Sequence, residues 1–202
     1  MTFEEIDKLV ELSQQPLENK NLEAIMKRYE PENYYRFLYH LILATKPKVC
    51  IELGVYQAVA STFMAFATSQ YGGWVVGIDI NGVSLHDKFN KHKPKNYIFI
   101  NGDSTAEPVQ EIVKKIAMGK VGLVYQDSSH HYTPSCQEWA FYSQMLSENA
   151  VWICDDITPS FHDPNVDPPG KGMVQYFEGL PGKKKLYPNV LHYGSSQGVI
   201  LT

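Results

Sequence analysis

The chain has 202 residues with 44% hydrophobic and 20% charged residues, an ordinary composition for one globular domain with its own core. Its formal net charge of −4 disfavours nucleic acid as a partner, because nucleic-acid binders usually carry a basic face. The short apolar stretches predict no membrane span, and the acidic N-terminus and three isolated cysteines predict a cytoplasmic protein with reduced thiols.

The first 45 residues are helical in character. Apolar side chains fall near one face of the first segment, namely Phe3, Ile6, Leu9 and Val10. Pro31 is expected to start another apolar helix that runs through Leu43, because proline is favoured in the first helical turn. We therefore predict one domain over residues 1–202, with N-terminal helices over 1–45 and an α/β core over 46–202.

From Lys48 onward, short apolar runs alternate with Gly, Asp and Asn. Most of the segments between the runs are long enough for a helix, which is typical of a parallel sheet covered by helices. Because the runs are continuously apolar, we expect both faces of this sheet to be buried. The five strand-length runs are Val49–Leu53, Val75–Ile80, Tyr97–Ile100, Gly122–Tyr125 and Val151–Cys154.

The C-terminal part differs from this alternation. Prolines and glycines between Pro159 and Gly172 predict a loop over the carboxyl edge of the sheet, where it could act as a lid. The tail from Tyr187 to Leu201 indicates a closing hairpin, which would form an antiparallel edge of the sheet.

Carboxylates stand at or just after the end of nearly every predicted strand. In an open α/β sheet, ligands bind at this edge, near the point where the strand order reverses. Six negative charges along one rim would repel each other, so some of them must meet ligand hydroxyls, amines or a metal ion. A single Asp at such a position often only caps the next helix. The six residues are Glu52, Asp79, Asp103, Asp127, Asp155 and Asp156.

The first strand leads into a tight turn at Gly54 and then into a helix near Ser61. This loop lacks the further glycines of a dinucleotide-binding fingerprint, and the carboxylate of Glu52 would repel a pyrophosphate but suit an ammonium group. The loop therefore argues against NAD and for a nucleoside that carries an amino acid. Asp79, after the second strand, could bind a ribose diol, and the 101–104 segment could meet an adenine edge.

These loops, in this order, resemble those of class I S-adenosylmethionine-dependent methyltransferases. The resemblance covers residues 31–202 and implies a Rossmann-like fold with a mostly parallel seven-stranded sheet. Ala58 departs from it, because the family usually has a second glycine at that position. The resemblance implies a cofactor site in which Glu52 and Gly54 lie near the methionine, Asp79 at the ribose, and Asp103 and Ser104 at the adenine. Tyr56, Ser61, Ile80 and Asp127 complete the expected site.

A second group of candidate residues follows the fourth and fifth strands. The ends of these strands are close in space in a parallel sheet, so three carboxylates could converge there. Three hard oxygen donors with open positions suit Mg²⁺, or otherwise Ca²⁺ or Mn²⁺. The alternative is that one of the paired aspartates only caps a turn before Pro159. The expected metal ligands are Asp127, Asp155 and Asp156.

This arrangement resembles two related groups of enzymes. Cation-dependent O-methyltransferases of the catechol type have an Asp after strand four and a pair after strand five. The cephalosporin hydroxylase-like and macrocin O-methyltransferase-like group has a D-x-x-H-x-Y motif, which Asp127, His130 and Tyr132 match. The resemblance implies metal-assisted O-methylation of a small-molecule hydroxyl, with His130 as the general base in place of a lysine. His131 falls on an unspecified position of the motif.

Other classes stay open at this point. A non-catalytic S-adenosylmethionine-binding module would fit the Ala58 departure, whereas a hydroxylase is suggested by the label of one similar group. An NAD-dependent oxidoreductase is disfavoured by the missing glycines. The acceptor could be a sugar, a phenol or another hydroxyl compound, and the protein could form a homo-oligomer. Aromatic residues that could line an acceptor pocket are Tyr34, Tyr35, Phe161 and Tyr176.

Overall fold

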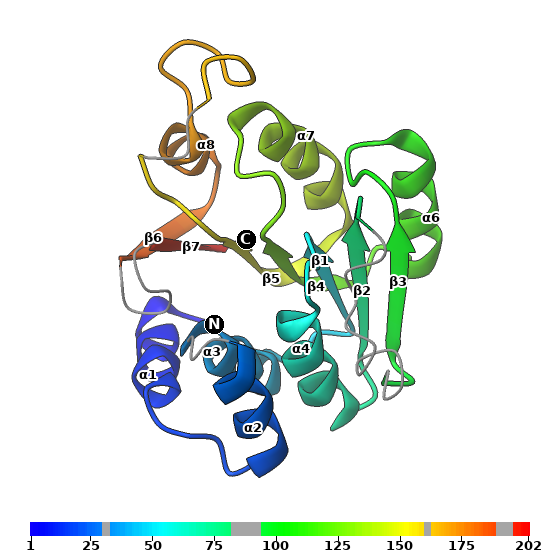
Figure 1. The fold of residues 1–202 in the computed structure, drawn as a ribbon, viewed down its shortest axis with the longest axis vertical. Helices are drawn as coiled ribbons and strands as arrows, with labels where there is room; N and C mark the ends of the chain where they lie inside the picture. Colours follow the sequence, from blue (N-terminus) through cyan, green and yellow to red (C-terminus); the bar gives the residue numbers. More distant parts are fainter. Residues whose placement is uncertain (30–32, 82–93, 160–162, 189–195) are drawn as a thin grey trace.

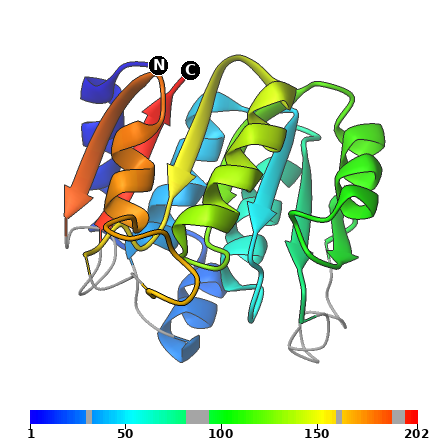
Figure 2. The ribbon, with the colours of Figure 1, turned by 90° about the horizontal axis from the view of Figure 1, so that it is seen from above.

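A computed structural model describes residues 1–29, 33–81, 94–159, 163–188 and 196–202. One twisted sheet runs through the middle of the molecule, with helices on both of its faces (Figures 1 and 2). Pro31 and Phe161, which the sequence singles out, lie outside the described residues.

The sheet has seven strands in the order β3-β2-β1-β4-β5-β7-β6. The first five strands are parallel, and β7 lies antiparallel between β5 and β6. The predicted α/β class, the parallel core and the C-terminal hairpin are therefore confirmed, with β6 as the outermost strand on that side. The strands are β1 (Val49–Leu53), β2 (Trp74–Asp79), β3 (Tyr97–Asn101), β4 (Val121–Gln126), β5 (Leu146–Cys154), β6 (Lys183–Pro188) and β7 (Ser196–Leu201).

Four described helices precede β2 and cover one face of the sheet, and three later helices cover the other face (Figure 1). Among the described residues, no helix is both long enough and apolar enough to cross a bilayer. The first group is α1 (Phe3–Ser13), α2 (Lys20–Tyr29), α3 (Asn33–Thr45) and α4 (Val59–Ser69). The second group is α6 (Glu107–Ala117), α7 (Tyr132–Tyr142) and α8 (Met173–Gly179), and a short 3₁₀ helix, η1 (Ser143–Met145), follows α7.

The apolar side chains of the strands contribute to two separate hydrophobic cores, one on each face of the sheet. Successive side chains of a strand point to opposite faces of the sheet. In β1, Cys50 packs with the N-terminal helices and α4, whereas Ile51 packs with α6 and the later helices. In β5, Ile153 and Trp152 divide in the same way. Both faces are therefore dry, which explains why the strands lack the polar alternation of a half-exposed sheet.

The N-terminal helices are an integral part of the core. Arg36 of α3 forms a bidentate ion pair with Glu23 of α2, in which both N–O distances are 2.8 Å. Glu23 also accepts a hydrogen bond from the Leu17 amide. The ring of Tyr34 stacks on that of Tyr125 in β4 at a centroid distance of 6.0 Å. The helices therefore close the sheet face beside the carboxyl end of β4.

Ala58, the departure from the family pattern, precedes α4 in a left-handed conformation with φ of 58°. This is the backbone region that glycine occupies without strain and that costs an alanine roughly 1–2 kcal/mol. The loop thus keeps the geometry that a glycine would give. Its methyl group is buried among the residues of the core on the α4 face.

We expect Ala58→Gly to leave the free energy of unfolding within about 0.5 kcal/mol of its present value. Relief of the left-handed strain offsets the loss of a buried methyl group and the higher entropy of the unfolded chain. Ala65→Gly, in the middle of the same helix and equally buried, should lower it by about 2 kcal/mol. Urea unfolding of both variants measures the difference, and equal losses would contradict the strain.

Candidate functional site

A cavity of about 600 Å³ lies beyond the carboxyl ends of β1, β2, β3 and β4. The order of the sheet reverses between β1 and β4, which is where open α/β sheets bind their ligands. The residues predicted for a cofactor that line it are Gly54, Tyr56, Asp79, Ile80, Asp103, Ser104 and Asp127. Its other walls are Ile78, Asn81, Gly102, Thr105, Ser128, Ser129, His130, Pro134 and Glu138.

Gly54 allows the loop after β1 to pass close to the end of β4. Its φ is 84°, and a Cβ at this position would lie 1.9 Å from the backbone oxygen of Asp127. The Gly54 amide donates to the Ile78 carbonyl oxygen at 2.9 Å, and the Asp127 amide donates to the Leu53 carbonyl oxygen at 2.8 Å. The glycine is therefore required by the close contact between two loops of the site.

Asp79 holds the end of β2 against the loop after β1. One carboxylate oxygen accepts hydrogen bonds from the amides of Val55 and Tyr56, both at 2.8 Å, and the other accepts one from the Asn81 amide at 2.7 Å. Tyr56, 72% exposed, has a φ of 45°. A carboxylate fixed by three backbone amides at the cavity wall has about one lone-pair position left to accept a hydrogen bond from a hydroxyl.

Glu52 and Ser61 do not line the cavity. Glu52 is 1% exposed, and the Ser61 hydroxyl donates to its carboxylate while lying 3.1 Å from the Tyr97 hydroxyl oxygen. Burial raises the pKa of Glu52 well above its usual range, although the hydrogen bond from Ser61 opposes the shift. The pair lies beneath the loop after β1 and supports it from inside the protein.

The loop after β3 carries Asp103 and Ser104 to the cavity. Asp103 is exposed and accepts hydrogen bonds from the Thr105 amide and hydroxyl at 2.8 and 2.7 Å. The Ser104 hydroxyl donates to Glu138, a buried carboxylate of α7 that also lines the cavity. Glu138 is not among the candidates that the sequence indicates, because a position within a helix does not show that its side chain faces the end of a strand.

Asp127, His130 and Asp156 form a compact group beside the same cavity, with ligand atoms that all lie within 4.8 Å of one another. His130 lies between the two aspartates: its Nε2 is 3.0 Å from Asp127 Oδ1, and its Nδ1 is 3.2 Å from Asp156 Oδ2. His130 and Asp156 both have left-handed backbones, with φ of 53° and 54°. Such strained positions cluster at functional sites, where the surrounding contacts hold them.

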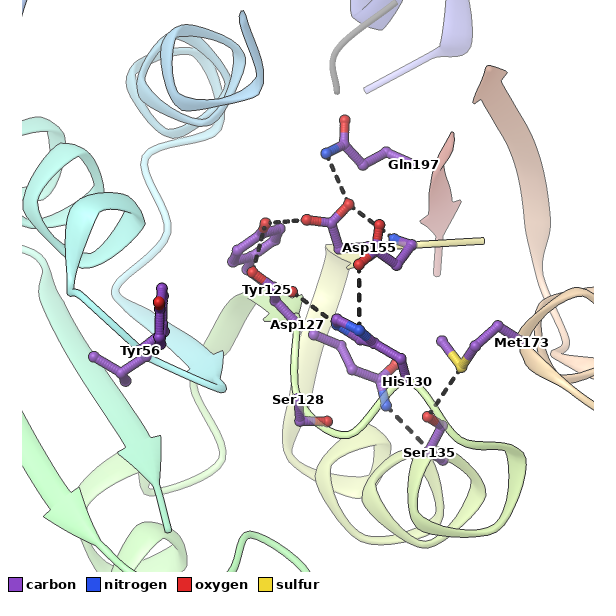
Figure 3. Close-up of polar contacts among 12 residues, drawn as sticks. Tyr56, Tyr125, Asp127, Ser128, His130, Ser135, Asp155, Met173 and Gln197 are labelled. Carbon is purple, nitrogen blue, oxygen red and sulfur yellow. Dashed lines mark hydrogen bonds and ion pairs between the residues drawn. The ribbon is translucent and has the colours of Figure 1, made fainter. Parts of the chain in front are cut away.

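Asp155 lies outside this group, although the sequence predicted it as a third metal ligand. It is 1% exposed, and its Oδ1 accepts hydrogen bonds from the Asp156 amide at 2.8 Å and from Gln197 Nε2 at 2.9 Å. Its Oδ2 accepts one from the Tyr125 hydroxyl at 2.6 Å, and that hydroxyl oxygen is 3.2 Å from Asp127 Oδ2 (Figure 3). Asp155 thus ties β4, β5 and β7 together behind the group.

The charges of this group shift one another's pKa values. Burial and the negative charge of Asp155 raise the pKa of Asp127 to about 7, although the hydrogen bond from His130 opposes this shift. Burial lowers the pKa of His130, but the hydrogen bond and charge of Asp127 and the charge of Asp156 outweigh it, so the pKa is raised. The group therefore stabilises a positive charge between two carboxylates.

The residues around the motif of His130 have separate roles. His131 Nδ1 lies 3.3 Å from Asp167 Oδ2, and the Tyr132 amide donates to Asp167 Oδ1 at 2.7 Å. Asp167, which belongs to the proline-rich loop, thereby caps the start of α7, where His131 gives no side-chain cap. Tyr176 is buried and donates to Gln126 Oε1 at 2.7 Å, so it does not line the cavity.

Comparisons with known proteins agree with this geometry. A family model described as a methyltransferase domain matches residues 51–157, slightly more than half of the chain. No curated protein sequence matches this chain.

Several solved structures share the fold at low identity. TomG, an O-methyltransferase of Streptomyces achromogenes involved in tomaymycin synthesis and solved with S-adenosylmethionine, is 13% identical, with a TM-score of 0.65 over 84% of this chain and 79% of its own. An O-methyltransferase of Bacillus cereus, solved with S-adenosylhomocysteine, is 15% identical, with a TM-score of 0.63 over 98% and 90%. The Podospora anserina methyltransferase PaMTH1, also solved with S-adenosylhomocysteine, is 14% identical, with a TM-score of 0.63 over 98% and 87%.

The family match runs from β1 to the residue after Asp156, so it contains the loops that wall the cavity and the group around His130. The strand order is that of a Rossmann-like sheet closed by an antiparallel hairpin. The chain belongs to the methyltransferase domain family and has the Rossmann-like fold of class I methyltransferases.

Proposed function

We propose that the protein transfers a methyl group from S-adenosylmethionine to a hydroxyl of a small molecule, with a divalent cation at the acceptor. One observation carries the proposal: a single cavity is lined both by Asp79, which suits a nucleoside, and by Asp127 and His130, the two members of the Asp127–His130–Asp156 group that reach it. The solved complexes of the similar O-methyltransferases with S-adenosylmethionine or S-adenosylhomocysteine support the choice of cofactor.

In the proposed site, successive parts of the cofactor contact the loops that follow β1 and β2. Asp79 accepts a hydrogen bond from a ribose hydroxyl, with its orientation fixed by the amides of Val55, Tyr56 and Asn81. Gly54 lines the cavity near the place proposed for the methionine part, and Ile80, 65% exposed, offers an apolar surface to the base. Glu52 does not contact the cofactor in this arrangement. Its buried carboxylate accepts a hydrogen bond from the Ser61 hydroxyl and thereby supports the loop after β1.

The donor set fits a divalent cation. Asp127 and Asp156 place carboxylate oxygens on either side of His130, and hard oxygen donors favour Mg²⁺ or Mn²⁺. When bound by these aspartates, such an ion would lower the pKa of a coordinated acceptor hydroxyl and fix its direction. Asp155, with both oxygens hydrogen-bonded, holds the Asp156 backbone in place.

His130 is the proposed general base. It lines the cavity and its ring lies between the two aspartates, where a proton taken from the acceptor would be stabilised by their charge. In the structure Nε2 contacts Asp127 and Nδ1 contacts Asp156. With a cation bound by the two aspartates, one ring nitrogen would be released and could then take the proton of the acceptor hydroxyl. Transfer then depends mostly on the alignment of the acceptor oxygen with the methyl group.

Replacement of Asp79 tests the cofactor site. We expect Asp79→Asn to weaken binding of S-adenosylhomocysteine at least about tenfold, because hydrogen bonds to a charged group are worth roughly 1.5–3 kcal/mol. Titration calorimetry measures the change. Glu111→Gln, on the exposed side of α6, is the matched control and should bind normally. A wild-type protein that binds no S-adenosylhomocysteine would refute the proposed function itself.

Replacement of His130 tests the base. With labelled S-adenosylmethionine and a panel of catechols and sugars as acceptors, His130→Gln should lower kcat about 10²- to 10⁴-fold and change the affinity for S-adenosylhomocysteine less than threefold. His131→Gln is the matched control, because His131 contacts Asp167 and does not line the cavity. Full turnover by the His130 variant would exclude the assignment.

Replacement of Asp156 tests the cation site. Mn²⁺, followed by electron paramagnetic resonance, should bind the wild-type protein and bind Asp156→Asn at least about tenfold more weakly, because one carboxylate ligand is lost. Asp163→Asn is the control with an aspartate outside the group. If the Asp156 variant and the wild-type protein take up Mn²⁺ equally, the aspartates do not form the site.

A further inference from the structure

We propose that Glu138 selects the base of the cofactor by accepting a hydrogen bond from the 6-amino group of adenine. This inference rests on the proposed binding of S-adenosylmethionine in the cavity. It gives a specificity role to a residue of α7 that no strand-end pattern indicates.

Glu138 is a buried carboxylate held by hydroxyl and amide partners. It is 1% exposed, one oxygen accepts from the Ser104 hydroxyl, and the other accepts from Gln126 Nε2 at 2.7 Å and from the Ser128 hydroxyl at 2.8 Å. No hydrogen bond or ion pair among the described residues gives Glu138 a cationic partner. Burial of a carboxylate is unfavourable unless hydrogen-bond donors surround it. Three side chains supply these donors to Glu138.

The core fixes which atoms of Gln126 face Glu138. The indole N–H of Trp152 can only donate, and it donates to Gln126 Oε1 at 3.1 Å. The Tyr176 hydroxyl donates to the same oxygen at 2.7 Å. The amide nitrogen of Gln126 must therefore point to Glu138, which makes the Glu138 oxygen an acceptor. Gln126, Trp152 and Tyr176 are all buried, so this polarity is built into the packed interior.

Two loops of the cavity meet at Glu138. Ser104 belongs to the loop after β3 and Ser128 to the loop after β4, and all three residues line the cavity. Asp79, the proposed ribose contact, lies at the end of β2, which is between β3 and β1 in the sheet, and lines the same cavity. A nucleoside held at Asp79 would direct its base toward this pair of serines and the carboxylate behind them.

The chemistry of the carboxylate decides which base fits. A carboxylate offers about four lone-pair positions and no donor, and the protein fills three of them here. The remaining position can accept from the 6-amino group of adenine, whereas the 6-oxo group of hypoxanthine presents another acceptor and is repelled. Sites built to bind a donor reject analogues without it more strongly than apolar pockets reject a change of size.

The test compares S-adenosylhomocysteine with two analogues, S-inosylhomocysteine, which has a 6-oxo group, and the purine analogue with hydrogen at position 6. We expect the wild-type protein to bind the purine analogue about tenfold more weakly than S-adenosylhomocysteine and the 6-oxo analogue more weakly still. In Glu138→Gln, the amide can turn its N–H₂ to the oxo group, so the preference for adenine should fall to near one. Glu111→Gln, an exposed control, should keep it.

The outcomes separate this inference from the proposed function. Equal wild-type affinity for all three ligands would overturn the role of Glu138, and this result needs no variant to fold. Equal weakening of all three ligands in Glu138→Gln would show a merely structural carboxylate and would overturn it too. Failure of the wild-type protein to bind S-adenosylhomocysteine would instead refute the cofactor.

Discussion

The architecture depends on how the protein accommodates carboxylates that one parallel sheet brings to a single edge. Parallel strands end along the same edge of the sheet, so the acidic residues that follow different strands lie close to one another. Three of these carboxylates are stabilised by hydrogen bonds from neutral donors. Glu52 receives the Ser61 hydroxyl, Asp79 receives three backbone amides, and Asp155 receives Tyr125, Gln197 and the Asp156 amide.

The pair Asp127 and Asp156 is treated differently, because an imidazole lies between the two carboxylates. His130 has a left-handed backbone between them. Burial and the charge of Asp155 raise the pKa of Asp127, whereas the contacts with Asp127 and Asp156 raise the pKa of His130 against the effect of burial. A site that stabilises positive charge in this way is suited both to a cation and to a proton taken from an acceptor.

The interior supports the site from behind through Gln126. This single buried amide receives Trp152 and Tyr176 on one side and binds Glu138 on the other. The packing of the core on the α7 face is thereby connected to the loops after β3 and β4 by directional hydrogen bonds. These hydrogen bonds fix the orientation of the Gln126 amide, and the amide in turn fixes the Glu138 carboxylate. The cavity wall at Glu138 is therefore preorganised before any ligand binds.

The sequence by itself determined the α/β class, the five parallel strands and the strand-end carboxylates, because continuous apolar runs and the acids after them are local patterns. Four residues that it proposed for a cofactor site, Gly54, Asp79, Asp103 and Asp127, line one cavity, and their roles stay predictions. Only the tertiary structure decided which carboxylates face that cavity. Glu52 and Asp155 follow the same pattern but turn into the protein, toward Ser61 and Tyr125, whereas Glu138 reaches the cavity from a helix. Side-chain direction at a strand end depends on partners distant in sequence, and no local pattern contains them.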